Sequence, residues 1–221
     1  MNNPIKGVLY LEREHFELSL ETRADMLQYI YPPEFVSNLD IINADGLKLN
    51  LSEFIKKNNV IFTDLIIVLS SSIIFEREFK TGQESATQEY MDNVPFETIS
   101  IIRIPTQLGT KVLVANATFY TLLADVFLQF GVKVDFVVPE LALGGPVGTF
   151  SVSTARYILT RNEALAPYKF VIDSSTVTTL QPTETKQEKV AKKKCISFVL
   201  TACFWYFNFN FVVCAFSASL I

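Results

Sequence analysis

The chain has 221 residues, of which 49% are hydrophobic and 19% are charged, so it is more apolar than an ordinary soluble domain. Its length allows one domain with an attachment, or two very small domains. When the three lysines at 192–194 are set aside, the 19 basic residues fall to 16 against 23 acidic ones. The resulting charge of −7 disfavours nucleic acid as a partner.

Two strands are predicted near the start of the chain, because apolar and polar residues alternate between Val8 and Leu20. The polar stretch Glu12-Arg13-Glu14-His15 separates them as a turn. Further along, Asp45-Gly46 is a tight-turn signal. A short helix is expected over Asn50–Asn59.

The next segment predicts a buried strand followed by an exposed one. Asp64–Leu69 is a continuous apolar run, which is typical of a central strand that is covered on both faces. Ile73–Phe79 alternates instead, so we expect an edge strand with one wet face, on which Glu76-Arg77-Glu78 is solvated. A polar helix is expected over Glu84–Asp92, ended by Pro95.

A strand pair and an apolar helix come next. The strands are expected over Ile99–Ile104 and Thr110–Ala115, joined by a connection that contains proline and glycine. Apolar residues with a period of about 3.6 predict a helix over Thr118–Phe130. Asn116 is expected to cap its start, and Gly131 to follow its end.

The last predicted elements are a strand over Val132–Val138, a helix over Ser151–Ala166 and a short strand over Phe170–Ile172. Gly144–Gly148 is interpreted as a flexible exit loop, because no Lys-Ser/Thr pair follows it as in a Walker loop. The order of strands and helices predicts a mixed α/β domain over residues 1–172, with one contiguous core.

The C-terminal part predicts a membrane anchor. Residues 173–194 form a polar linker, and the 27 residues from Cys195 to Ile221 carry no charge, which is long enough for a transmembrane helix. A buried core helix or an out-of-frame tail remains an alternative. The cationic cluster Lys192, Lys193 and Lys194 before the span, without a secretory signal, predicts that residues 1–172 face the cytoplasm.

All three cysteines, Cys195, Cys203 and Cys214, lie in the predicted span. Their spacing fits no zinc or redox motif, so they are interpreted as packing residues. Acylation of Cys195 at the membrane edge is a minor alternative.

Three stretches between Leu65 and Gly144, about 80 of the 221 residues, resemble the actin-like domain of PilM and GspL proteins. These families are cytoplasmic scaffolds of type IV pilus and type II secretion platforms. Ile66–Phe79 is similar to their strand, turn and strand, and Glu89–Glu97 to their helix that ends in an apolar-Pro-Phe turn. Lys111–Asn116 and Val134–Leu143 are similar to the strands on either side of their next helix. The resemblance implies an actin-like (ribonuclease H-like) half-domain with a mixed sheet.

Actin-like ATPases, as the resemblance implies, hold phosphates in two glycine-containing turns, with an aspartate that arranges Mg²⁺. The first turn here, Glu12 to His15, has neither the aspartate nor the glycine, and its glutamates would repel phosphate. The second candidate, Asp173-Ser174-Ser175-Thr176, also lacks glycine and is interpreted as the start of the linker.

No other motif predicts catalysis or a metal site. His15 stands among Glu12, Glu14 and Glu17, but a lone histidine seldom holds a transition metal. Ser70-Ser71-Ser72 offers hydroxyls without a base nearby in sequence. We therefore expect no enzyme activity, no cofactor, no catalytic residue and no metal.

Three functional hypotheses follow. The first is a non-catalytic scaffold, tethered to the inner membrane, that binds other assembly proteins of a pilus or secretion platform and can form a homo-oligomer. The second is a nucleotide-binding actin-like protein that a partner chain completes. The third is a tail-anchored α/β domain of unrelated role.

Overall fold

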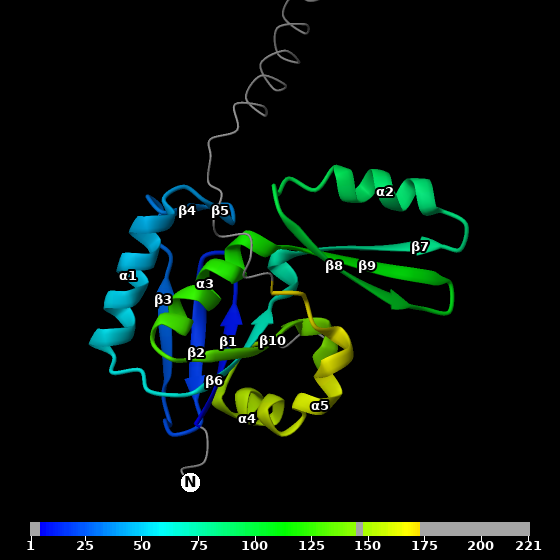
Figure 1. Cartoon of the computed structure of the whole chain (residues 1–221). Helices are drawn as coiled ribbons and strands as arrows, with labels where there is room; N and C mark the ends of the chain where they lie inside the picture. Colours follow the sequence, from blue (N-terminus) through cyan, green and yellow to red (C-terminus); the bar gives the residue numbers. More distant parts are fainter. Residues whose placement is uncertain (1–4, 145–147, 173–221) are drawn as a thin grey trace, which may run out of the picture. The chain divides into compact units, whose positions relative to one another are not determined.

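A mixed five-stranded sheet organises the described part of the chain, residues 5–144 and 148–172 of the computed structural model. Its order is β10-β6-β1-β2-β3 (Figure 1). Strand β2 is antiparallel to β1 and β3, whereas β6 and β10 run parallel to β1. The strands are β1 (Lys6–Leu11), β2 (His15–Leu20), β3 (Met26–Ile30), β6 (Asp64–Leu69) and β10 (Lys133–Pro139).

This sheet confirms the predicted mixed α/β class. Its order places β2 antiparallel to both of its neighbours, so the sheet is mixed, as expected. The two strands on either side of the Glu12–His15 turn are confirmed as β1 and β2, and the continuous apolar run is the central strand β6. The sequence did not predict β3.

Two helices cover one face of this sheet. They are α1 (Ala44–Lys57) and α3 (Ala117–Gln129), which pack against each other, and α3 also packs on β10. The connection from β3 to β6 and the one from β6 to β10 cross the sheet in the same direction. Because such crossovers are right-handed, both helices are placed on the same face.

The opposite face is covered by short helices near the C-terminal end of the described residues. These are α4 (Val152–Thr160), α5 (Asn162–Leu165) and the 3₁₀ turn η3 (Ala166–Tyr168). Alternation along β1 explains the two faces, since Leu9 packs on the α3 side and Val8 on the α4 side.

Helix boundaries differ from the prediction in two places. Helix α1 begins at Ala44 rather than Asn50, because the Asn43 side chain accepts a hydrogen bond from the Gly46 N–H at 2.9 Å and caps the helix. Asp45-Gly46 therefore lies in the first helical turn. The single helix expected over Ser151–Ala166 is broken at Arg161, whose φ of −119° leaves the helical region.

The predicted caps of α3 are confirmed, whereas the last predicted strand is wrong. The Asn116 side chain accepts a hydrogen bond from the Phe119 N–H at 3.3 Å, and Gly131 adopts a φ of +79° just past the helix end. Phe170–Ile172 is not a strand. Its backbone is held by single hydrogen bonds, including one from the Phe170 N–H to the Val137 carbonyl at 2.7 Å.

A second, three-stranded sheet is inserted between β6 and α3. It has the order β7-β9-β8, and its strands are β7 (Ile74–Lys80), β8 (Ile99–Pro105) and β9 (Gly109–Asn116). Helix α2 (Glu84–Asp92) covers one face, where the Tyr90 ring lies 5.5 Å from the Phe79 ring and the Arg77 guanidinium lies over both. The predicted strands and helix are confirmed, including β7 as an edge strand, but the sequence did not predict a separate sheet.

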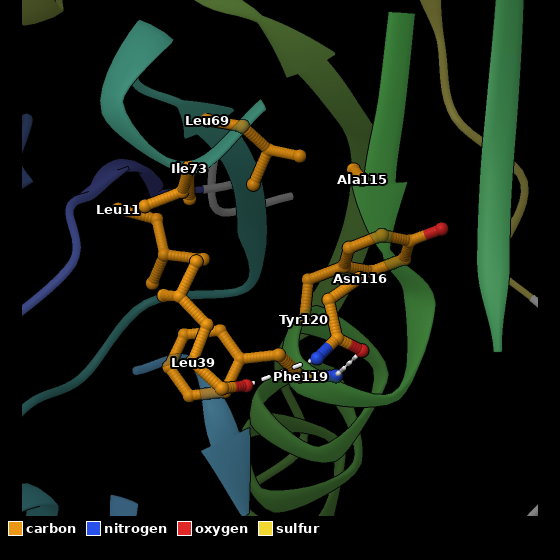
Figure 2. A pocket seen from close by; sticks show the side chains of 8 residues that line it. All are labelled: Leu11, Leu39, Leu69, Ile73, Ala115, Asn116, Phe119 and Tyr120. Carbon is orange, nitrogen blue, oxygen red and sulfur yellow. Dashed lines mark hydrogen bonds between the residues drawn. The ribbon is translucent and has the colours of Figure 1, made fainter. Parts of the chain in front are cut away.

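A small hairpin of β4 (Val36–Ser37) and β5 (Asp40–Ile41) reaches the junction of the two sheets. At its tip Leu39 is buried with a φ of +69°, and its carbonyl accepts a hydrogen bond from the Asn116 side chain at 2.9 Å (Figure 2). A left-handed conformation is unusual for leucine, so burial and this hydrogen bond must hold it. The pocket beside Leu39 has a volume of about 10 Å³, room for about one water molecule.

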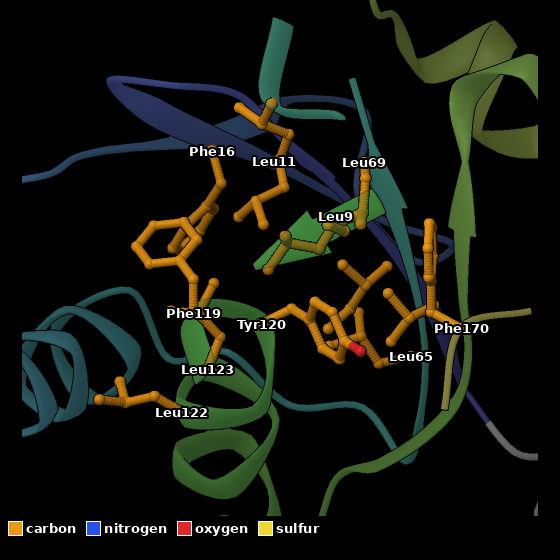
Figure 3. Close-up of a cluster of buried hydrophobic side chains, with 14 of the residues drawn as sticks. Leu9, Leu11, Phe16, Leu65, Leu69, Phe119, Tyr120, Leu122, Leu123 and Phe170 are labelled. Carbon is orange, nitrogen blue, oxygen red and sulfur yellow. The ribbon is translucent and has the colours of Figure 1, made fainter. Parts of the chain in front are cut away.

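The buried side chains form two clusters rather than the one contiguous core that was expected. The larger cluster lies between the main sheet and α1 and α3, and it continues into the second sheet through Val112 and Leu113. Figure 3 shows Phe119, Tyr120 and Leu123 of α3 facing the sheet residues Leu9 and Leu65. The smaller cluster lies under α4. A sheet that is covered on both faces divides its core in this way.

None of the helices in residues 5–144 and 148–172 has the length and apolar character needed to cross a bilayer. The predicted linker 173–194, with its cationic cluster, and the predicted span 195–221 lie outside the described residues. The three cysteines and the candidate turn at Asp173 lie outside them too.

Candidate functional site

The carboxyl ends of the parallel strands β1, β6 and β10 meet at one edge of the main sheet. Ligands of open α/β sheets bind in the crevice at this edge, so a nucleotide site is to be looked for here. Three segments converge on it: the end of β1, the 3₁₀ turn η1 (Ser71–Ile73) after β6, and the 3₁₀ turn η2 (Glu140–Leu143) after β10.

Glu140 ties these three segments together. It is the first residue of η2 and is only 4% exposed. Its Oε1 accepts a hydrogen bond from the Tyr10 hydroxyl at 2.9 Å. Its Oε2 accepts one from the Ser71 N–H at 2.8 Å and another from the Ser71 hydroxyl. Hydrogen bonds from two different segments to one buried carboxylate fix the relative positions of β1, β6 and β10.

Tyr10 fills space at the same edge. Its ring stacks on Phe150, with the centroids 4.8 Å apart and the planes 6° from parallel. Burial raises the pKa of the Tyr10 phenol above its usual value, and the hydrogen bond to Glu140 raises it further. The Tyr10 hydroxyl therefore stays protonated and acts as a donor to Glu140. We call Tyr10, Ser71 and Glu140 the edge network.

The turn between β1 and β2 folds over η1. The Glu12 N–H donates to the His15 carbonyl at 2.9 Å, which closes the turn without glycine. The Arg13 guanidinium donates to the Ser72 carbonyl at 3.3 Å. This arrangement leaves no glycine at which a phosphate could approach the backbone closely.

The histidine and the serines have local partners. The Nε2 of His15 lies 3.6 Å from Glu12 Oε2, an ion pair only when the imidazole is protonated. Ser70 caps η1, and its hydroxyl is hydrogen bonded to the Ser72 hydroxyl. Among the described residues there is no group of three or more His, Cys, Asp or Glu side chains that could hold a metal ion.

Neither Glu140 nor Tyr10 was predicted as a site residue from the sequence. Ser71 was noted only as part of a serine run, and Glu140 only within the stretch Val134–Leu143 that resembles PilM and GspL proteins. The available signal was an acidic residue directly after the proline that ends an apolar strand. That position lies at the sheet edge as soon as the strand is known to be parallel.

No protein-family profile and no curated protein sequence matches this chain. A solved structure of the PilM-PilN type IV pilus biogenesis complex is similar at 13% identity and a TM-score of 0.41, over 63% of this chain and 48% of that one. The cytoplasmic domain of EpsL, an inner membrane component of the type II secretion system of Vibrio cholerae, is similar at 10% identity and a TM-score of 0.39, over 62% and 56%.

A Bacteroides thetaiotaomicron protein with an actin-like ATPase fold and unknown function is similar at 12% identity and a TM-score of 0.36, over 65% of this chain and 57% of that one. The chain thus spans about half the length of each of these three structures. Because all three TM-scores lie below 0.5, these likenesses establish no shared activity.

Proposed function

We propose that this chain is a non-catalytic scaffold of a pilus or secretion assembly platform, held at the cytoplasmic face of the inner membrane by residues 195–221. The observation that carries the proposal is the edge network, because Tyr10 and Ser71 both donate to Glu140 at the sheet edge where a nucleotide would bind. The sequence resemblance to PilM and GspL proteins supplies the platform role.

The charges at this edge support a role without nucleotide. Glu12 and Glu14 flank the turn after β1, and Glu140 is buried at the end of β10. Carboxylates repel phosphate unless a cation lies between them.

Surface features of the second sheet support a role in protein binding. Helix α2 exposes Glu84, Glu89 and Asp92, and the tip of the β8–β9 hairpin exposes Leu108. Neither feature is needed for the core. The exposed acids of α2 are suited to a partner with basic residues.

We expect millimolar Mg-ATP to leave the melting midpoint of the full-length chain unchanged in a thermal unfolding scan. A ligand at 100 times its dissociation constant would stabilise the fold by about 2.7 kcal/mol and raise the midpoint by about 5 to 10 °C. An increase that Asp173→Ala abolishes would contradict the scaffold and favour the nucleotide-binding alternative. Mg-ADP serves as a second ligand in the same scan.

The direct test is capture of partners from membranes. Membranes from cells that have not been cross-linked are washed at alkaline pH, and membranes from cross-linked cells are solubilised for capture. We expect the chain to stay in the washed membranes and to bring down other inner-membrane assembly proteins. A matched bait that ends at residue 191 controls for the anchor. Release of the full-length chain by the wash would contradict the tether, and capture without any assembly protein would contradict the platform role.

A further inference from the structure

The two outer edges of the second sheet differ in chemistry. Hydrogen bonds from the Ala117 N–H to the Thr98 carbonyl and from the Thr106 N–H to the Gly109 carbonyl bracket the β8–β9 pair. In an antiparallel pair the bonded residues alternate, so Ser100, Ile102 and Ile104 bond to β9. The backbone groups of Ile99, Ile101 and Arg103 then point away from β9. In the described part of the chain, β9 is the one strand that pairs with β8.

The edge of β7 is protected, as native sheet edges usually are. By the same alternation, the backbone N–H and carbonyl groups of Glu76, Glu78 and Lys80 point away from β9. Two of these residues are acidic, and the Lys80 N–H is already used, because it donates to the Gln83 side chain at 2.9 Å. Charge and local capping are the common means of blocking strand addition.

The edge of β8 lacks this protection over most of its length. Its sequence is Ile-Ser-Ile-Ile-Arg-Ile-Pro, with one charge, and the side chains of Ile99, Ile101 and Ile104 are half-buried. Pro105 stands at the far end and removes a donor only there. An apolar edge with free N–H and carbonyl groups accepts another strand.

We propose that β8 pairs antiparallel with β8 of a second copy of this chain, about a two-fold axis at Ile102. This register joins the two three-stranded sheets into one. Ile101 of each copy lies opposite Arg103 of the other copy, and the two residues exchange both backbone hydrogen bonds. Pro105 lies opposite Ile99 at the ends, where a missing N–H disrupts the ladder least.

Charge permits self-pairing at the β8 edge and opposes it at the β7 edge. In the register about Ile102, Arg103 faces isoleucine, and no like charges lie directly opposite each other. If β7 paired antiparallel with β7 of a second copy about its central residue, Arg77 would lie opposite Arg77 and Glu76 opposite Glu78. Like charges directly opposite are destabilising in a sheet, so self-pairing through β7 is disfavoured. The inference does not depend on the proposed function.

The interface is small. Pairing of two seven-residue strands buries less surface than the roughly 1,200 Å² of a stable complex. We therefore expect a reversible dimer with a dissociation constant of about 10 to 100 µM, a range typical of transient contacts.

Hydrogen exchange on the unaltered full-length chain tests the register without a mutation. At about 300 µM the amides of Ile99, Ile101 and Arg103 should exchange about three- to sixfold more slowly than after dilution by about a hundredfold, because a dimer of this affinity leaves part of the chain monomeric. The amides of Ile102 and Ile104 bond to β9 and should exchange at the same slow rate at both concentrations. An exchange rate at Ile101 and Arg103 that does not change with concentration would overturn the proposal.

A pair of substitutions at Ile101 then tests the charge argument by sedimentation of the full-length chain. Ile101→Lys places a cation opposite Arg103 twice in the dimer and should raise the dissociation constant at least about fivefold. Ile101→Glu places an anion there and should leave the dissociation constant unchanged or lower it. Both variants lose the same isoleucine, so equal weakening by the two would reject this register, and an unaffected dimer in both would place the interface elsewhere.

Discussion

Phe127→Ala is expected to lower the free energy of unfolding by about 3 to 5 kcal/mol. Phe127 lies on the buried face of α3 and is fully buried. Its ring centroid is 5.8 Å from that of Phe62 and 6.5 Å from that of Phe16. Removing the ring therefore leaves a cavity between α3, β2 and the segment before β6, where rigid aromatic neighbours limit collapse. A typical domain has only about 5 to 15 kcal/mol of stability, so the loss is a large fraction of the total.

The neighbouring residue supplies the control. Leu128 is 61% exposed on the other side of the same helix, so Leu128→Ala should change the free energy of unfolding by less than about 0.5 kcal/mol. Both variants are compared with the parent by chemical denaturation followed by circular dichroism. Equal, small losses for the two variants would show that the buried face of α3 has been assigned wrongly.

Helix α3 and strand β6 were predictable because each carries a local pattern. The 3.6-residue period of α3 is bounded by Asn116 and Gly131, two residues with capping geometry of their own. The run Asp64–Leu69 is apolar without interruption, as a strand with two covered faces must be. In both cases one segment contains the whole signal.

Other features depend on contacts that no single segment contains. Strand β3 has only five residues, and it exists because β2 offers a free edge beside it. The start of α1 is fixed by the Asn43 cap, which overrides the turn signal of Asp45-Gly46. The second sheet was missed as a unit, because alternation predicts strands but does not say which sheet they join.

The candidate site could be predicted only in part, for the same reason. The sequence alone shows that the Glu12–His15 turn lacks glycine. It does not show that Tyr10 and Glu140, 130 positions apart, hydrogen bond across the sheet edge. That contact requires β10 to lie next to β6 and β6 next to β1, which is a property of the whole sheet.

Loss of the Glu140 carboxylate should be nearly as costly as loss of a core ring. In Glu140→Ala the Tyr10 hydroxyl and the Ser71 N–H each lose their acceptor, and Tyr10 is only 5% exposed. Hydrogen bonds to a carboxylate contribute about 1.5 to 3 kcal/mol each, so we expect the free energy of unfolding to fall by about 2 to 4 kcal/mol. Denaturation of the full-length variant and parent measures the difference.

A double-mutant cycle separates the hydrogen bond from the rest of the effect. Tyr10→Phe alone should cost about 1 to 2 kcal/mol, and this cost should shrink when Glu140 is already alanine. Tyr31→Phe is the matched control, because the buried Tyr31 hydroxyl has no hydrogen-bond partner among the described residues. Removing it should cost nothing or raise stability. Additive losses for Tyr10 and Glu140, or equal losses for Tyr10→Phe and Tyr31→Phe, would mean that the edge network does not hold β1 to β10.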